Sequence, residues 1–346
     1  MKRYATPNRL VVFILAVFIA KGLAAAQTLV APDTINPGDP LLCWMTSDRP
    51  VLSASALLRN SEGKNLSSAE SFFMPSESGE FLYGFLLAAP VKAQPGAASV
   101  RVTAIFEASG AMPPGAENGA GTQAPETRDR VELRADIVIG AKRFMKEDIP
   151  LDKANTAIRV APDPAKAAES ATFARIFDMR DLTAIFAVGS MTKPLSVGWR
   201  ETAGFGDERR YLYDGGGGDT TIHGGVDLGA KTGSEVLASA AGRVAFAGPR
   251  IVTGNTIVLE HLPGLFSLYM HLSAIDVVEG DTVVAGALIG RVGSTGLSTG
   301  PHLHWEIRVG NVSVNPYYWL SRPLLQRPPL DKDAVSGKIG APAEGR

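Results

Sequence analysis

The stretch "HLHWEIRV", residues 302–309, alternates polar and apolar side chains. Residues two apart on a β-strand point to the same face, so His302, His304 and Glu306 share one face. The opposite face carries only the apolar side chains of Leu303, Trp305 and Ile307. The pattern predicts a strand that packs on its apolar side and presents two histidines together. Two hydrogen-bonded surface histidines and one edge of a metal site both remain open interpretations.

A second segment, "HGGVDLG", places His223 and Asp227 four residues apart, with two glycines between them that disfavour a helix. On an extended or looped segment both side chains can converge on one point. Two imidazoles and a carboxylate form a donor set suited to Zn²⁺, and three protein ligands leave a fourth position for water. His271, in "LYMHLS", ends a strand-like run and is predicted to lie at the edge of such a site. His261, in "LEHLPG", is predicted to be structural.

The composition is ordinary for a globular protein, and the chain is long enough for two domains. The 346 residues are 45% hydrophobic and 20% charged, which excludes a disordered chain. The 37 glycines and 23 prolines favour many turns, as in β-rich folds. The 34 basic residues are balanced by 35 acidic ones, so nucleic acid is not a predicted partner.

The N-terminus indicates export. "MKRYATPNR" is basic, "LVVFILAVFIA" is apolar, and "GLAAAQ" supplies small residues, which is the order of a secretory signal peptide. We predict a signal peptide over residues 1–26, with an uncleaved N-terminal anchor as the alternative. Cys43 is the only cysteine, so the chain has no internal disulfide, and its apolar context predicts a buried, inert thiol. Export without disulfides fits the periplasm or cell envelope of a bacterium at least as well as a eukaryotic secretory route.

Residues 27–145 are expected to form an antiparallel β-sandwich of the immunoglobulin-like type. Five short alternating or apolar runs are bounded by Pro, Gly, Ser or Asn: "PGDPLLCWM", "VLSASALLRN", "EFLYGFLLA", "ASVRVTAIF" and "VELRADIVI". The Gly- and Pro-rich segment 109–129 is expected to be a long loop between two of these strands. The predicted fold class is therefore mainly β in this half of the chain.

A linker with a helix is predicted over residues 146–195, and strands return in residues 196–320. In "PDPAKAAESATFARIFDMRD", Asp163 is placed to cap the helix and Pro164 fits its first turn. Further strand candidates are "EVLASAAGRVAFAG", "NTIVLEHL", "LFSLYMHLS" and "DTVVAGALIGRVG". Residues 321–346 lose periodicity and are expected to be a flexible tail.

The segments "HGGVD", "YMHLS" and "GLSTGPHLHWE" together resemble the three signature segments of the lysostaphin/LytM-type zinc metallopeptidases, which cleave peptide cross-links of bacterial peptidoglycan. The resemblance runs from about Thr202 to Pro316. It implies a C-terminal antiparallel-sheet peptidase domain and peptidoglycan stem peptides as substrate. One departure is the glycine run in "YDGGGGDTTIH", which we expect to loosen the approach to His223.

Residue by residue, the resemblance implies that His223, Asp227 and His304 bind one Zn²⁺ ion. It also implies that His271 and His302 flank the reacting water and the scissile carbonyl, and we assign proton transfer to these two rings jointly. Glu306 is expected to orient a ligand imidazole. Tyr269 is expected either to line the groove or to have a structural role.

Two alternative functions remain open at this point. A catalytically inactive domain of the same family could regulate or recruit another cell-wall hydrolase, but such loss is expected to show as a substituted ligand, and all five residues are present. The hairpin "VEGDTVVAGALIG" also resembles those of lipoyl and biotinyl carriers, yet it lacks the lysine that carries the cofactor. The N-terminal domain could position the enzyme, bind an envelope protein partner or occlude the groove.

Overall fold

The computed structural model describes residues 27–75, 79–107, 128–179 and 181–326. The predicted signal peptide, most of the predicted loop at 109–129 and residues 327–346 of the predicted tail lie outside the described residues. The first residues of that tail are not free of the fold, because Leu324 and Leu325 are buried in the core. Within them, the protein is mainly β and its sheets are mostly antiparallel. The described residues contain two α-helices, α1 (Lys153–Val160) and α2 (Pro164–Asp178).

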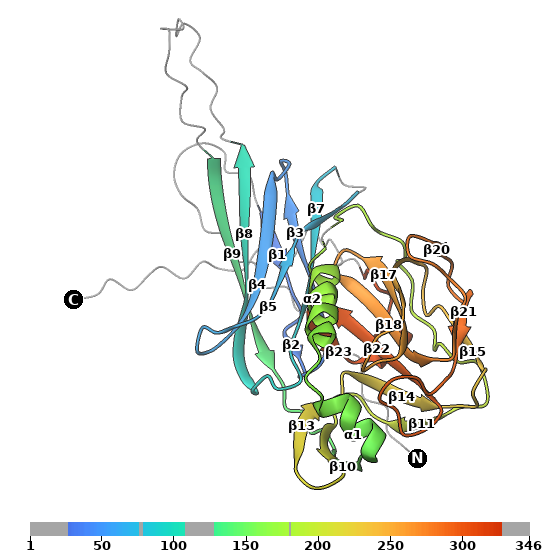
Figure 1. Ribbon diagram of the computed structural model, residues 1–346. Coiled ribbons are helices and arrows are strands. Elements are labelled where there is room, and N and C mark those ends of the chain that lie inside the picture. Colours follow the sequence, from blue (N-terminus) through green and yellow to red (C-terminus); the bar gives the residue numbers. More distant parts are fainter. Residues whose placement is uncertain (1–26, 76–78, 108–127, 180, 327–346) are drawn as a thin grey trace, which may run out of the picture.

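Residues 28–139 supply two sheets, drawn in blue and teal in Figure 1. The four-stranded sheet has the order β1 (Thr28–Val30), β3 (Pro40–Ser47), β7 (Phe81–Ala88) and β6 (Phe72–Met74). The five-stranded sheet has the order β2 (Thr34–Ile35), β9 (Arg128–Ile139), β8 (Gly96–Glu107), β4 (Ser53–Asn60) and β5 (Asn65–Glu70). All five predicted runs lie on strands, namely β3, β4, β7, β8 and β9.

The four-stranded sheet is buried on both faces, and this explains the nearly continuous apolar runs of β3 and β7. One face, which includes Cys43 and Phe85, packs against the five-stranded sheet. The other face, which includes Trp44 and Leu86, packs against strands of the C-terminal half. Cys43 is fully buried, as predicted, and burial raises the pKa of its thiol, so the thiolate form is suppressed.

The C-terminal half is built on an eight-stranded sheet. Its order is β11 (Arg200–Ala203), β14 (Gly225–Gly229), β22 (His302–Val309), β18 (Leu265–Leu272), β17 (Asn255–Leu262), β16 (Gly242–Gly248) and β20 (Thr282–Val283), with β23 (Val312–Val314) beside β22. A short helix, η1 (Pro316–Leu320), follows. One face carries Trp305 and Leu303, both fully buried in the core shared with the four-stranded sheet. The predicted apolar side of residues 302–309 is therefore confirmed.

Two smaller sheets border the eight-stranded one. The first has the order β15 (Glu235–Leu237), β21 (Leu288–Arg291) and β19 (Ala274–Ile275). The second has the order β10 (Lys146–Pro150), β12 (Glu208–Leu212) and β13 (Gly218–Ile222), with β10 parallel to β12. Residues 146–150, in the stretch expected as linker, thus pair with a strand of the C-terminal half. The glycine run at 215–217 forms the turn between β12 and β13, where all three glycines have positive φ.

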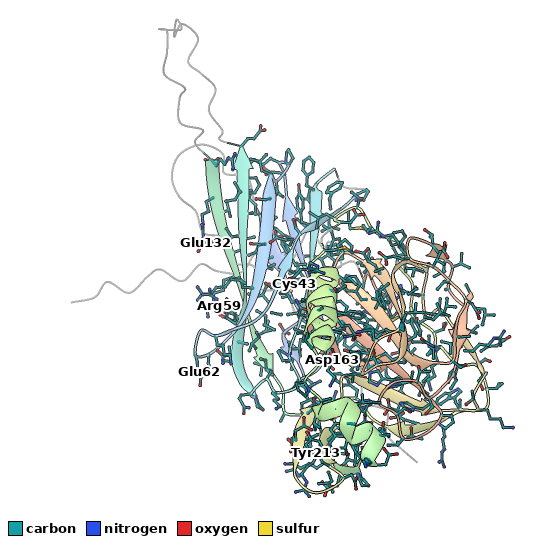
Figure 2. The ribbon with its side chains drawn as sticks, in the orientation of Figure 1. Cys43, Arg59, Glu62, Glu132, Asp163 and Tyr213 are labelled. Atoms are coloured by element: carbon teal, nitrogen blue, oxygen red, sulfur yellow. The ribbon has the colours of Figure 1, made fainter. Side chains whose placement is uncertain are left out.

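Helix α2 covers part of the second face of the eight-stranded sheet. Asp163 accepts a hydrogen bond from the backbone N–H of Ala165 and caps the helix, and Pro164 occupies its first turn. Phe173 and Phe177 pack on side chains of β16, β17 and β18. Figure 1 shows α2 in green beside β18 and β22, and Figure 2 shows Asp163 at the start of the helix. Among the described residues, no helix has the length and apolar character needed to cross a membrane.

Candidate metal centre and active site

Two adjacent strands and the segment before them bring three donor residues together. Asp227 on β14 is the direct register partner of His304 on β22. His223 lies between β13 and β14, where its backbone N–H donates to the carbonyl of Asp207. All three side chains are buried. Strand β13 separates the hairpin turn at 215–217 from His223, and the expected effect of the glycine run on the approach to this residue stays a prediction.

The three donor atoms form a nearly equilateral triangle. His223 Nε2 lies 3.0 Å from His304 Nδ1 and 3.1 Å from Asp227 Oδ1. His304 Nδ1 lies 2.9 Å from Asp227 Oδ1. Zinc bonds of 2.0–2.1 Å in a tetrahedron place their donors about 3.4 Å apart, so this triangle is close to the size that Zn²⁺ requires. No other trio of His, Cys, Asp or Glu in the described ranges converges in this way.

Hydrogen bonds on the outer side of each ring fix its orientation. His223 Nδ1 donates to the carbonyl oxygen of Gly204 at 2.6 Å, which leaves Nε2 as an acceptor that faces the triangle. His304 Nε2 lies 3.4 Å from Glu306 Oε2, so Nδ1 faces the triangle. Backbone carbonyl and carboxylate partners of this kind orient ligand imidazoles at metal sites. The predicted role of Glu306 agrees with this contact.

The electrostatics of the triangle favour a positive charge at its centre. Burial acts to raise the pKa of Asp227, but hydrogen bonds from His223 and His304 hold that pKa well below its ordinary value. Burial acts to lower the pKa of His304, but its contacts with Asp227 and Glu306 raise that pKa to about 9. The buried, ionised carboxylate of Asp227 therefore favours a cation beside the two imidazoles. The donor set, its geometry and its charge all fit Zn²⁺.

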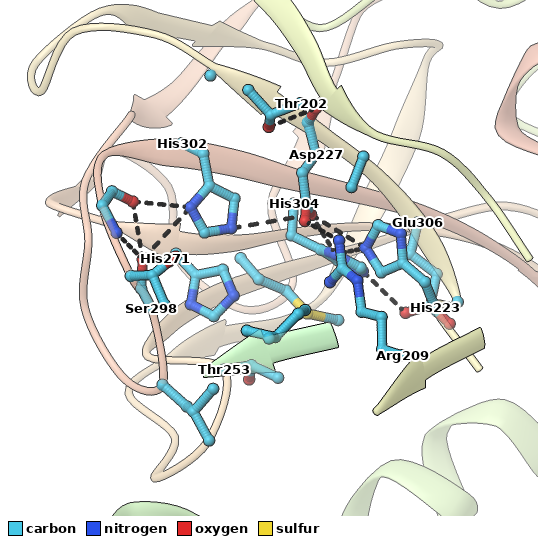
Figure 3. A pocket seen from close by; sticks show the side chains of 18 of the residues that line it. Thr202, Arg209, His223, Asp227, Thr253, His271, Ser298, His302, His304 and Glu306 are labelled. Atoms are coloured by element: carbon cyan, nitrogen blue, oxygen red, sulfur yellow. Dashed lines mark hydrogen bonds and ion pairs between the residues drawn. The ribbon is translucent and has the colours of Figure 1, made fainter. Parts of the chain in front are cut away.

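His271 and His302 lie beside the triangle, with ring centroids 4.7 Å apart. His271 Nδ1 donates to the carbonyl oxygen of Thr295 at 2.8 Å, and His302 Nδ1 donates to that of Gly300 at 2.8 Å. Each ring therefore keeps Nε2 as an acceptor, and His302 Nε2 is 3.8 Å from Asp227 Oδ1. Figure 3 shows the two rings side by side, next to Asp227 and His304.

The backbone at His271 is unusual. Among the described residues it is the only one other than glycine with positive φ, at 63°. Such a conformation costs about 1–3 kcal/mol and persists only when neighbouring contacts fix it. The His271 N–H donates to Thr253, and the ring donates to Thr295. Burial, and then the imidazoles of His302 and His304, lower the pKa of His271 to about 3, so its ring is neutral at neutral pH.

All five residues line one cleft of about 1280 Å³. One wall comes from β10 and α1, and another comes from the loop at 297–301 that precedes β22. Asn155 on α1 donates to the carbonyl of Ser298 and ties these two walls together. The cleft is large enough for several residues of an extended peptide.

Residues 221–316 match peptidase family M23. These residues are a peptidase M23 domain. The domain is 47% identical over 95 residues to the DD-carboxypeptidase/endopeptidase Mpg of Neisseria meningitidis, which is 28% of this chain and 22% of that protein. A longer stretch of the chain is 33% identical over 123 residues to the peptidoglycan DD-endopeptidase ShyB of Vibrio cholerae, which is 35% of this chain and 28% of that protein. The match thus spans between a fifth and a third of each relative.

A solved structure from Pseudomonas aeruginosa, described as a peptidase M23, shares the fold over most of the chain. It covers 82% of this chain and 93% of its own, with a TM-score of 0.50 and 19% sequence identity. At this identity the likeness concerns the fold alone. The compared region is therefore much longer than the family match at residues 221–316.

Arg209, which precedes the M23 domain, is a site residue that the sequence analysis missed. Its Nη2 donates to Asp227 Oδ2 at 2.6 Å, and its Nε lies 3.5 Å from Glu147 Oε2 on β10. Figure 3 shows its guanidinium against Asp227. Because Oδ2 is engaged by Arg209, Asp227 presents only Oδ1 to the triangle. Burial alternates along β12: Arg209 is buried, whereas Arg210 is exposed and pairs with Asp148. This strand parity was the signal that could have indicated Arg209.

Two further side chains of the M23 domain are structural. Tyr269 is fully buried, and its hydroxyl accepts hydrogen bonds from Ser239 N–H and Ser267 Oγ, so the structural interpretation is the right one. His261 is also fully buried, between the carbonyl oxygen of Ala241 and Ser267 Oγ. Its predicted structural role is confirmed.

Proposed function

We propose that this protein is an exported zinc metalloendopeptidase that hydrolyses peptide cross-links of bacterial peptidoglycan. The observation that carries the proposal is the triangle of His223, Asp227 and His304 donors with two further imidazoles beside it in one cleft. The names of two relatives, a DD-carboxypeptidase/endopeptidase and a peptidoglycan DD-endopeptidase, support the same reaction class. A regulatory domain without activity is disfavoured because none of the five residues is substituted.

In this proposal His223, Asp227 and His304 hold the metal. Bound Zn²⁺ supplies Lewis-acid polarisation of the peptide carbonyl and lowers the pKa of a water molecule from about 15.7 to about 7. Gly204, Glu306 and Arg209 contact the three ligand side chains from outside and would orient them for the metal.

The two remaining histidines handle the proton. His271 and His302 each present Nε2 as an acceptor, because each Nδ1 donates to a backbone carbonyl. A neutral imidazole within reach of the reacting centre can take a proton and return it to the leaving amine. The protonated ring also donates to the oxygen on which negative charge develops. We assign this proton transfer to both rings jointly, as predicted from the sequence.

The proposal extends to the whole chain. The basic and apolar N-terminal segment supports export to the periplasm or cell envelope. We assign residues 27–145 to an immunoglobulin-like sandwich domain, which is a candidate contact for an envelope protein partner, and residues 146–195 to a helix-containing linker. The peptidase domain then extends over residues 196–320.

Digestion of purified peptidoglycan tests the proposal. The full-length protein loaded with Zn²⁺ should release new fragments in which a peptide cross-link has been hydrolysed, as identified by mass spectrometry. A chelator should abolish the release and added Zn²⁺ should restore it. No new fragments across several wall chemistries would refute the hydrolase function.

A further inference from the structure

Two guanidinium groups line the cleft next to α2, each stacked on one of two aromatic rings of that helix that contact each other. Arg250 follows β16, and Arg308 lies on β22 on the same face as His304 and Glu306. Both line the cleft, although neither belongs to the triangle or to the pair of catalytic histidines. The reaction described above assigns them no task.

Aromatic rings of α2 hold both groups in place. The Arg250 guanidinium carbon lies 3.7 Å from the ring centroid of Phe173, and that of Arg308 lies 4.6 Å from the ring centroid of Phe177. The two rings are four residues apart on the helix and contact each other at 5.7 Å. Stacking on aromatic faces preorganises guanidinium groups for planar hydrogen bonding. The pair is therefore rigid before any ligand arrives.

The hydrogen-bonding capacity of the two groups is not saturated by the described residues. Arg250 Nε lies 3.5 Å from Glu169 and Arg308 Nε lies 3.5 Å from Glu306, but neither buried Nε makes a hydrogen bond. Arg308 Nη2 donates to the carbonyl of Asn311, and Arg250 Nη1 has only a 3.5 Å contact with Thr253. Arg250 Nη2 and Arg308 Nη1 donate no hydrogen bond to another described residue.

The distance of this pair from the metal centre suits a peptide. Arg308 is four residues beyond His304 on β22, which corresponds to about 13 Å along the strand. An extended peptide covers that distance in about four residues, and fewer are needed if the anionic group ends a side chain. Glu306 separates His304 from Arg308, so an anion at the pair does not compete for the metal.

We infer that Arg250 and Arg308 form a carboxylate-binding site that recognises an anionic group of the peptide substrate a few residues from the scissile bond. This inference rests on the proposed function. The planar forks of two neighbouring guanidiniums match the two oxygens of a carboxylate, and the bound anion relieves the repulsion between the two cations. A side-chain carboxylate and the terminal carboxylate of a short peptide share this chemistry.

Equilibrium binding of un-cross-linked stem peptides to the full-length, zinc-loaded protein tests the inference. Three synthetic peptides are compared by calorimetry: one with all carboxylates free, one with only the chain terminus amidated, and one with every carboxylate amidated. The variants are Arg250→Met and Arg308→Met. Arg322→Met is the matched control, because Arg322 also stacks on an aromatic ring, that of Tyr318 at 4.6 Å, but does not line this cleft.

Complete amidation should weaken binding to the wild-type protein about 10- to 100-fold, the effect of losing charge-assisted hydrogen bonds. Arg250→Met and Arg308→Met should weaken binding of the free peptide by about 10-fold or more and abolish the preference over the amidated one. The control should behave as wild type, and the terminally amidated peptide shows which carboxylate is recognised. Zinc content and thermal unfolding confirm that each variant is folded.

The inference is overturned if wild type binds free and fully amidated peptides within twofold, if the free peptide does not bind measurably, or if the variants weaken both peptides equally. Cross-link hydrolysis is measured separately. A protein that binds with carboxylate preference but cuts no cross-link would refute the proposed function and leave the binding site standing.

Discussion

Replacing Arg209 with methionine tests whether residues before the M23 domain hold the metal site in place. The substitution keeps most of the aliphatic length of the side chain and removes the guanidinium that donates to Asp227 Oδ2 at 2.6 Å. Both side chains are only 10% exposed, so water cannot replace the lost donor. Asp227 is left as a buried carboxylate with one unpaired oxygen.

The expected loss is large. Removing one partner of a buried ion pair costs about 3–5 kcal/mol, because the remaining charge stays desolvated. At about 2–4 °C for each kcal/mol in a domain of this size, the metal-free protein should unfold roughly 10 °C lower than wild type. Zinc affinity should fall about 10-fold or more, as it does when a partner of a metal ligand is removed. Added Zn²⁺ should restore part of the lost stability, because the cation compensates the charge of Asp227.

Calorimetric unfolding of the metal-free and zinc-loaded proteins, with zinc titration, measures both quantities. Arg210→Met is the matched control: Arg210 is the next residue, but its ion pair with Asp148 is exposed to solvent, so its loss should change the unfolding temperature little. If Arg209→Met unfolds within 2 °C of the control and binds zinc as wild type does, the positioning role of Arg209 is wrong.

Three further predictions concern other parts of the M23 domain. His304→Ala should lose bound zinc, whereas His271→Ala should keep zinc and lose turnover; full activity in both would contradict the site assignment. Burial lowers the pKa of His261 to about 4, below the unfolded value near 6.5. Because the unfolded state binds the proton first as the pH falls, this residue alone should lower the free energy of unfolding by ~2 kcal/mol between pH 7 and pH 5. His261→Gln should remove that part of the acid dependence in unfolding experiments, and an unchanged pH profile would refute it. In Gly293→Ala, the added Cβ would lie 2.4 Å from the backbone N of Ser273, so we expect reduced kcat with zinc content retained.

The alternation in residues 302–309 was enough to predict which histidines share a face, because parity is a local property of a strand. The register that sets Asp227 opposite His304 could not be predicted, since it depends on pairing of segments 77 residues apart. The same limit applies to His271, whose ring reaches the site through a left-handed backbone conformation that no sequence pattern indicates. The grouping of all five residues into one site came from the resemblance of the three motifs to the family, not from the spacing of the residues.

Other parts of the fold were missed because their signals are weak. Helix α1 spans only eight residues and has a single buried side chain, that of Asn155, so no apolar periodicity marks it. Strands β12 and β13 are rich in charged residues, threonine and glycine, and the glycine run that joins them was interpreted only as a departure from the family pattern. Arg209 was missed for the same reason: because strand β12 was not predicted, strand parity could not be used to distinguish the buried arginine of "DERRY" from the exposed one.

The double burial of β3 and β7 limits how this chain could be divided or transplanted. Trp44 and Leu86 share a core with Trp305 and Trp319, so each half of the molecule completes the interior of the other. A fragment restricted to residues 221–316 would expose that apolar surface to water and would also lack Arg209. Residues 221–316 are therefore the part that resembles the family in sequence, but a fragment that keeps this core buried must also include the four-stranded sheet.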